Sequence, residues 1–187
     1  MRISSGLGKG RKMKTPKGEK TRPTSGMVRQ AVFNLTGSVP GKVFLDLYAG
    51  SGAVGIEALA RGANHVTFIE SDINALRILK ENTNSMHFTD KVKIVKGVLP
   101  KVLEHLNIDS CQIIFADPPY HKDICSALLK SLANKALHPE VIIVLQHDKN
   151  DLLSSIPSQF SILKTRNYGN TTLSILSLHH KDNPVLN

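Results

Sequence analysis

The chain has 187 residues, of which 41% are hydrophobic and 21% are charged. This length and composition are typical of one globular domain with its own core, and they exclude disordered and collagen-like chains. The longest strongly apolar run, Val141 to Leu145, is too short to cross a bilayer. The two cysteines, Cys111 and Cys125, form neither a disulfide framework nor a metal-ligand cluster. We therefore expect a cytoplasmic protein with no membrane partner and no metal.

The positive charge lies mainly at one end of the chain. Lys and Arg number 24 and Asp and Glu number 15, which gives a net charge of +9, and residues 1–30 hold nine basic side chains but only one acidic one. A concentrated basic arm is typical of proteins that bind a polyanion such as nucleic acid, because each cation that neutralises a phosphate releases a counterion. The alternative is a solvated tail that aids solubility, and charge alone does not separate the two.

After the arm, strand-like and helix-like segments alternate. Thr24 or Ser25 can cap a first helix, because Val28, Ala31 and Leu35 recur behind it at helical spacing. Apolar runs predict strands at Val43–Leu47, His65–Ile69, Val92–Val95, Gln112–Ala116 and Val141–Leu145, and helices are expected over Ala53–Arg61, from Asp72, over Leu99–Leu106 and over Ile124–Ala133. Helices between fully apolar strands predict a parallel sheet that is covered on both faces.

The end of the chain has a different pattern. Phe160–Lys164 and Leu173–Leu178 flank the turn signal Asn167-Tyr168-Gly169-Asn170, which predicts an antiparallel hairpin. The predicted fold is therefore a doubly wound α/β domain with a Rossmann-like, seven-stranded sheet. Five strands are parallel, the C-terminal hairpin lies at one edge, and the basic segment is an N-terminal extension.

A glycine-rich turn follows the first predicted strand. Gly50, Gly52 and Gly55 form a Gly-x-Gly-x-x-Gly pattern, which permits a tight turn and a close approach of the backbone to a ligand. Glu70 ends the second strand 20 residues after Gly50, where its carboxylate can accept hydrogen bonds from a ribose diol. These two features fit a nicotinamide dinucleotide as well as any other adenosyl ligand, and a turn that only connects strand and helix is the alternative.

Asp46 favours one of these ligands. Its carboxylate stands at the end of the first strand, just before the glycine turn, where it would repel a pyrophosphate. The same carboxylate suits a cation, such as the α-amino group and sulfonium of S-adenosylmethionine. The order Asp-x-x-x-Gly-Ser-Gly therefore favours an adenosyl cation and makes a dehydrogenase the weaker interpretation.

The tetrapeptide Asp117-Pro118-Pro119-Tyr120 follows the fourth predicted strand. Its prolines fix an extended backbone that offers the Asp117 carboxylate and the Pro118 carbonyl as two acceptors beside an aromatic ring. Two acceptors can bind both hydrogens of a nucleobase amine and aim its lone pair at a methyl group, while Tyr120 stacks on a base that has left its stack. The amines of adenine, guanine and cytosine all fit, and a plain Asp-Pro turn is the alternative.

Together these motifs resemble the class I S-adenosylmethionine-dependent amino-methyltransferases. Further segments are similar to the bacterial RsmD family, whose members methylate N2 of one guanine in 16S rRNA within the small ribosomal subunit. These segments are Gly10-Arg11-Lys12, Thr15-Pro16, Thr21-Arg22-Pro23-Thr24-Ser25, the helix containing Val28-Arg29 and Phe33-Asn34, the run from Phe44 to Gly52, and Tyr168-Gly169.

The resemblance implies S-adenosylmethionine as cofactor and 16S rRNA, in the small subunit or an assembly intermediate, as partner. The residues that it implies are Asp117, Pro118 and Tyr120 for catalysis, Asp46, Tyr48, Ala49, Gly50, Ser51, Gly52, Glu70 and Ser71 for the cofactor, and Arg11, Lys12, Arg22 and Thr24 for the substrate. We expect an RNA-binding extension over residues 1–23, a methyltransferase domain over 24–180 and a frayed tail over 181–187.

Two positions depart from the family pattern. Gly26-Met27 stands where members commonly have Asp-Arg, and Gly97-Val98 stands where many members place an acid that holds the adenine amine, so we expect backbone groups to hold the adenine here. Two other functions stay open. One is an amino-methyltransferase that acts on adenine N6 in RNA or DNA, and the other is a non-catalytic RNA-binding assembly protein.

Overall fold

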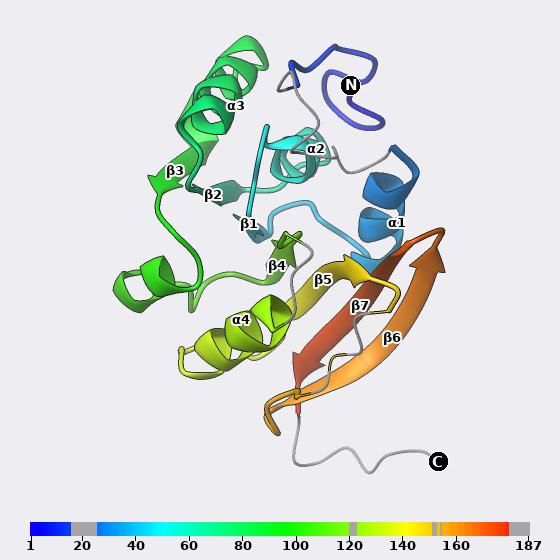
Figure 1. Ribbon diagram of the computed structural model, residues 1–187. Coiled ribbons are helices and arrows are strands. Elements are labelled where there is room, and N and C mark those ends of the chain that lie inside the picture. Colours follow the sequence, from blue (N-terminus) through cyan, green and yellow to red (C-terminus); the bar gives the residue numbers. More distant parts are fainter. Residues whose placement is uncertain (16–25, 120–122, 151–152, 154, 180–187) are drawn as a thin grey trace.

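The structure is a computed structural model that describes residues 1–15, 26–119, 123–150, 153 and 155–179. Seven strands form one sheet in the order β3-β2-β1-β4-β5-β7-β6 (Figure 1). The strands are β1 (Val43–Leu47), β2 (His65–Glu70), β3 (Val92–Lys96), β4 (Ile113–Ala116), β5 (Ile142–Asp148), β6 (Phe160–Tyr168) and β7 (Thr171–Leu178). Strands β1 to β5 are parallel, and β7 is antiparallel to both β5 and β6. The predicted sheet of five parallel strands and a hairpin is confirmed.

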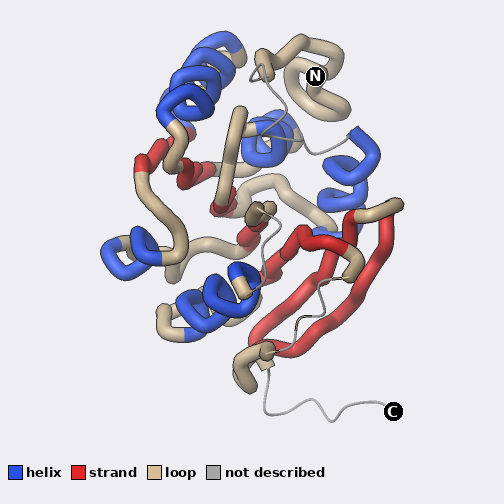
Figure 2. Tube along the Cα trace, in the orientation of Figure 1, coloured by secondary structure: helices blue, strands red, loops and turns tan. Residues whose placement is uncertain are grey.

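Helices cover both faces of this sheet (Figures 1 and 2). One face packs against α1 (Gly26–Thr36), α2 (Ala53–Ala60) and α3 (Ile73–Ser85), and the other packs against α4 (Ile124–Ala133) and the 3₁₀ segment η2 (Lys101–His105). A second 3₁₀ turn, η1 (Thr89–Lys91), precedes β3. Successive side chains of a strand alternate between the two cores, so Phe44 lies in the first and Leu45 in the second.

The direction of strand progression reverses between β1 and β4. From β1 the chain builds β2 and β3 outward on one side, and β4 and β5 then follow on the other side. In open α/β sheets, ligands bind at the carboxyl ends of the strands where the order reverses. The end of β1 carries the glycine turn, and the end of β4 carries Asp117-Pro118-Pro119.

Three segments differ in detail from the prediction. The helix expected over Leu99–Leu106 is the short 3₁₀ segment η2, in which Leu103 N–H donates to the carbonyl of Pro100. Short 3₁₀ segments of this kind are common as connectors between strands and helices. Strand β5 runs on through Gln146 to Asp148, and the hairpin strands β6 and β7 extend to a two-residue turn at Gly169-Asn170.

Residues 1–15 pack against the domain. Ile3 is only 2% exposed and Met13 only 4%, and both belong to the core under α1, α2 and α3. Arg2 and Lys12 pair as an isolated antiparallel bridge, so the intervening residues form a closed loop above α2 (Figure 2). The basic side chains of this segment and Leu7 are exposed, whereas Ile3 and Met13 are buried, so these two residues attach this part of the extension to the domain.

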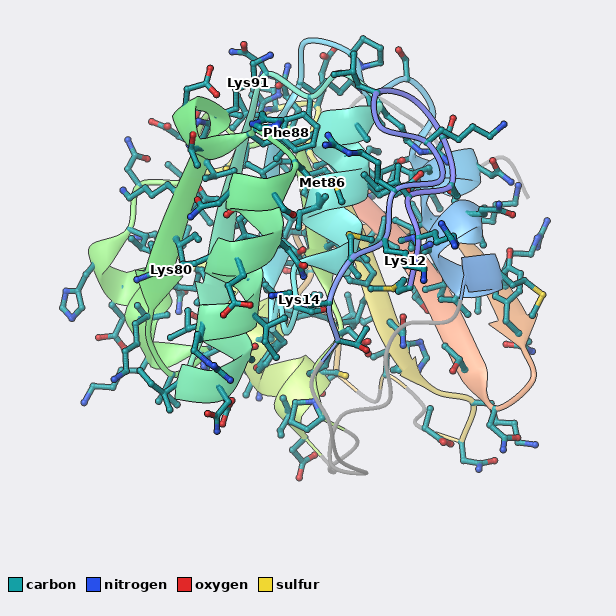
Figure 3. All side chains as sticks on the ribbon, turned by 90° about the horizontal axis from the view of Figure 1, so that it is seen from above. Lys12, Lys14, Lys80, Met86, Phe88 and Lys91 are labelled. Atoms are coloured by element: carbon teal, nitrogen blue, oxygen red, sulfur yellow. The ribbon has the colours of Figure 1, made fainter. Side chains whose placement is uncertain are left out.

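Asn82 of α3 connects this segment to the glycine turn. Its Oδ1 accepts a hydrogen bond from Lys14 N–H (2.8 Å), and its Nδ2 donates to the carbonyls of Lys14 (3.0 Å) and Ser51 (2.9 Å). In Figure 3, Lys14 lies beside α3, where its Nζ is 2.8 Å from an Oε2 of Glu81. One buried amide therefore joins the N-terminal segment, α3 and the turn after β1.

A buried carboxylate on α2 makes a second connection. Glu57 is fully buried and accepts hydrogen bonds from Ser4 N–H (2.8 Å), Ser4 Oγ (2.6 Å) and Arg61 Nε (3.1 Å). The Nε of Arg29 on α1 lies 3.5 Å from Glu57 Oε2, and Arg29 Nη2 donates to the carbonyl of Arg2 (2.7 Å). Glu57 therefore holds the N-terminal loop, α1 and α2 together through a network of buried charges.

We expect Glu57→Ala to lower the free energy of unfolding by about 3–5 kcal/mol, because it leaves the buried Arg29 without its counter-charge. Urea denaturation followed by circular dichroism measures the change. The exposed Glu140 provides the control, since its carboxylate holds no other element within the described part of the chain. Equal stability of the two variants would show that the Glu57 network does not hold the N-terminal loop.

Candidate active site

Three carboxylates gather at the carboxyl ends of adjacent strands. Glu70 ends β2, Asp46 lies near the end of β1, and Asp117 directly follows β4. Asp46 pairs in register with Phe68 on β2 and with Phe115 on β4, so its neighbours on both sides are the strands that carry the other two acids. The order of the strands alone places these groups together at the reversal point.

Burial raises the pKa of Asp46 well above its ordinary value. The Gly55 N–H acts in the opposite direction, and the charges of Asp117 and then Glu70 raise the pKa further. The ionised form of Asp46 is therefore disfavoured in the protein without a ligand. A cation at this edge would offset the mutual repulsion of the three carboxylates, whereas a pyrophosphate would add to it.

Asp46 has a local structural role as well. It is 1% exposed, and its Oδ2 accepts a hydrogen bond from Gly55 N–H at 2.8 Å, in the first turn of α2. This contact fastens the start of α2 to the end of β1, and it satisfies one of the amide groups that a helix N-terminus leaves without a partner. A contact between Asp46 and a cofactor remains a prediction.

Two of the three glycines of the turn have no room for a side chain. Gly52 has a φ of 80°, and a Cβ at this residue would stand 2.3 Å from Leu79 Cδ1. A Cβ at Gly55 would stand 2.3 Å from Phe68 Cε1, so only glycine lets α2 pack this closely against β2. Gly50 differs, because a Cβ there would meet nothing within 4 Å, and the space above the turn is open.

Glu70 connects the turns that follow β1 and β2. Its Oε2 accepts a hydrogen bond from Gly50 N–H (2.7 Å), and its Oε1 accepts from Ser71 N–H (2.7 Å) and Asp72 N–H (2.8 Å). Asp72, from which the sequence predicted a helix, caps α3 by accepting from Ala75 N–H (2.7 Å). Glu70 therefore holds the turn after β1 and the turn after β2 in one fixed arrangement.

Beside these turns lies a pocket of about 260 Å³. Its walls come from the turns after β1 and β2, the segment after β3, the loop after β4 and the start of α4. The lining residues are Tyr48, Ile69, Glu70, Ser71, Gly97, Val98, Leu99, Pro100, Pro119, Ile124 and Ala127. An apolar cavity with a few polar groups at its rim is the usual form of a small-molecule site.

Tyr48 has an unusual position in this wall. Its φ of 58° lies in the left-handed region, which is uncommon for a residue other than glycine. Its hydroxyl is buried without a hydrogen-bond partner among the described residues, and burial, with a smaller effect from Cys125, raises its pKa to about 12. Together with the anionic rim, this donor and the apolar walls fit an adenosyl cation such as S-adenosylmethionine.

The other predicted residues fall into three groups. Ala49, Gly50, Ser51, Gly52 and Ser71 all lie in the two turns at the strand ends, and Pro118 is buried next to the partly exposed Asp117. Arg11 and Lys12 are exposed on the N-terminal loop (Figure 3 labels Lys12), outside the described pocket lining. Tyr120, Arg22 and Thr24 lie outside the described residues.

The wall after β3 is formed by Gly97, Val98, Leu99 and Pro100, and Val98 is 68% exposed. The sequence analysis expected backbone groups at Gly97-Val98 to hold an adenine, but it did not single out Leu99 and Pro100. The rule that ligands bind at the carboxyl ends of strands would have selected this segment, because it directly follows the predicted third strand. The same rule selects Gln146 on β5, which the sequence analysis also missed.

A larger surface cavity of about 610 Å³ lies between η2 and α4. Its lining contains none of the three carboxylates, whereas Glu70 lines the smaller pocket, which is therefore the candidate site. Within the described residues, no three His, Cys, Asp or Glu side chains gather as metal ligands. No helix in the described part of the chain is long and apolar enough to span a membrane.

The sheet order, the glycine turn and the pocket at the reversal point define a Rossmann-like methyltransferase fold. The family model described as "Conserved hypothetical protein 95" matches residues 1–177. The chain belongs to this family, which is the RsmD family that the motifs indicated.

Relatives and solved structures agree with this assignment. The chain is 33% identical over 179 residues to YlbH of Bacillus subtilis, and the aligned region covers 94% of this chain and 97% of that protein. It is 31% identical over 173 residues to the ribosomal RNA small subunit methyltransferase D of Haemophilus influenzae, covering 90% of this chain and 89% of the relative. The solved structure of yhhF from Escherichia coli superposes with a TM-score of 0.85 at 28% identity, covering 95% of this chain and 97% of that one.

Asp46→Asn should not destabilise the protein at neutral pH. A carboxyl group with a raised pKa favours the folded state below its ordinary pKa, and this contribution is lost as the pH rises through the raised value. Asn avoids the buried charge and can still accept from Gly55 N–H. We expect the variant to melt at or above the wild-type temperature at pH 8, by up to about 2–4 °C, with the difference shrinking towards pH 4. A variant that melts well below the wild type at pH 8 would contradict the burial penalty.

Proposed function

We propose that the protein transfers a methyl group from S-adenosylmethionine to the exocyclic N2 amine of a specific guanine in 16S rRNA of the small ribosomal subunit. The observation that carries the proposal is the position of Asp117 and Pro118 at the end of β4, next to the anionic pocket at the reversal point. The name of the Haemophilus influenzae relative, a ribosomal RNA small subunit methyltransferase, supports rRNA as the substrate. The amine and the base are proposed from the tetrapeptide and the family resemblance.

The residues around the pocket would hold the cofactor in three parts. Asp46 and the glycine turn would face its methionine end, Glu70 its ribose, and the segment Gly97–Pro100 its adenine. When bound, S-adenosylmethionine supplies a methyl group activated by a positively charged sulfur. The carboxylates favour that charge, and the adjacent Tyr48 hydroxyl is available to donate a hydrogen bond.

Asp117 and the Pro118 carbonyl would act on the amine. Each accepts one N–H of the base, which orients the nitrogen lone pair towards the methyl carbon. The nitrogen forms its bond to carbon as the carbon–sulfur bond breaks and its electron pair stays on sulfur. The amine then loses a proton to Asp117 or to water, which restores its neutral form. In this proposal Tyr120 stacks on the extruded base.

The N-terminal loop would contact the RNA. Arg11 and Lys12 project from a segment that Ile3, Met13 and the Asn82 amide hold in place. A basic group on a fixed backbone loses less conformational freedom on binding than one on a tail. We assign Arg22 and Thr24, together with Arg11 and Lys12, to contacts with the substrate.

Cofactor binding should weaken as the pH falls. A cation near Asp46 is stabilised by the ionised form of this side chain. Below the raised pKa of Asp46 the side chain is protonated, so it must lose its proton when the cation binds, and this lowers the affinity. Calorimetry with S-adenosylmethionine across pH 5 to 8 measures the effect. In Asp46→Asn, affinity at pH 8 should fall, and the part of the pH dependence that comes from Asp46 should disappear. An unchanged pH profile in the variant would contradict the role of this carboxylate.

Asp117→Ala should abolish methyl transfer and leave cofactor binding intact. The assay follows tritiated methyl transfer to small ribosomal subunits from a strain that lacks the protein, and mass spectrometry identifies the methylated nucleoside. Asp109→Ala is the matched control, because Asp109 is an exposed acid at the opposite end of β4. N2-methylguanosine is the expected product. Wild-type turnover by Asp117→Ala would overturn the role of Asp117, and N6-methyladenosine would overturn the choice of base.

A further inference from the structure

Gln146 lies on β5, next to the strand that carries Asp117. Strands β4 and β5 are parallel, and Ala116 pairs with Leu145, so Asp117 and Gln146 are the next residues of the two strands. Phe115 and Val144 share the core under α1 and α2, and side chains of a strand alternate between faces. Gln146, two residues after Val144, therefore lies on this face of the sheet. Asp117, which directly follows β4, lies on it too, because its charge raises the pKa of Asp46, two residues after Phe44 of the same core.

The side chain of Gln146 is buried but incompletely bonded. Gln146 is 5% exposed, and its Oε1 has no hydrogen-bond partner among the described residues. A buried acceptor without a donor is costly to a folded protein, and such groups cluster where a ligand supplies the missing partner. The nearby pair of His147 and Ser174 is different, because His147 Nε2 and Ser174 Oγ lie 2.9 Å apart and are bonded.

The two sides of Asp117 are not equivalent. On one side lie Asp46, Glu70 and the pocket, whose described walls come from the turns after β1 and β2, the segment after β3, the loop after β4 and α4. On the other side the next group on the same face is Gln146 of β5. A base that binds to Asp117 through its amine would receive the methyl group from the side of the pocket. The edge of the base next to that amine would then face β5 on the other side.

We propose that Gln146 Oε1 accepts the N1–H of the target base and so selects guanine. This inference rests on the proposed methylation of a nucleobase amine. In guanine, the N2 amine is flanked by the donor N1–H on one side and by the acceptor N3 on the other. In adenine, the N6 amine is flanked by the acceptors N1 and N7, and in cytosine the N4 amine is flanked by the acceptor N3 and a C–H group. Among these three amines, only that of guanine offers the donor that an unpaired acceptor beside Asp117 requires.

Gln146→Met and Gln146→Glu test the contact. Met keeps the length and burial but removes the acceptor, whereas Glu keeps an acceptor and removes the amide donors. The matched control is Gln159→Met, because Gln159 is exposed at the start of β6 and bonds the carbonyl of Ala133. Each variant is assayed for methyl transfer to small subunits from the deletion strain, with thermal melting and S-adenosylmethionine affinity measured alongside.

The assay is repeated on subunits reconstituted with 2-aminopurine in place of the methylated guanine, because this base keeps the 2-amine but lacks N1–H. The wild type should lose about tenfold in kcat/KM on the change of base. Gln146→Met should be about tenfold slower than the wild type on guanine and lose nothing further on 2-aminopurine. Gln146→Glu and Gln159→Met should stay within about threefold of the wild type on guanine, with unchanged cofactor affinity.

Equal rates of Gln146→Met and wild type on guanine would overturn the inference. So would an equal loss on 2-aminopurine in both proteins, or a loss in Gln146→Glu as large as that in Gln146→Met. If the Met variant does not fold, Gln146→Asn repeats the test with an amide withdrawn by one methylene. A wild-type protein that methylates no guanine fails at an earlier step and overturns the proposed function instead.

Discussion

The hydrogen bond from Gly55 N–H to Asp46 Oδ2 is the contact on which the site depends. It fastens the first turn of α2 to the end of β1, so the glycine turn between them stands above the strand edge. It also keeps a carboxylate buried close to Asp117 and Glu70, whose charges raise its pKa further. The hydrogen bond that attaches α2 to β1 therefore also holds three carboxylates close together at the edge of the sheet. A positively charged ligand would reduce the repulsion between them.

The central strands and their ends could be predicted because buried parallel strands are continuous apolar runs. Strand β1 has the predicted bounds, and β4 begins one residue later than expected. The length of β5 could not be predicted in this way. Its last residues, Gln146 to Asp148, are polar and break the apolar run, although the ladder to β7 continues through Asp148. Gln146 was missed for that reason.

The packing of the N-terminal segment could not be predicted from the sequence, for a different reason. Its net charge dominates the local sequence, and the two residues that anchor it, Ile3 and Met13, are isolated apolar positions without periodicity. The adjacent residues Ser4 and Lys14 bond to partners that are distant in the chain, since Glu57 and Asn82 lie on α2 and α3. Contacts of this range depend on the tertiary fold, and a single sequence gives no local signal for them.

The strand order also places the proposed catalytic group and the proposed base-selecting group on neighbouring strands. The cofactor pocket draws on the turns after β1, β2 and β3, whereas the outer strands β5, β7 and β6 extend the sheet in the other direction. The end of β4 is next to both regions, and Pro118 and Pro119 restrict its backbone. A carboxylate placed there can contact an amine at the boundary of the two regions. A group on β5 lies one strand beyond, beside the part of the base that distinguishes one amine from another.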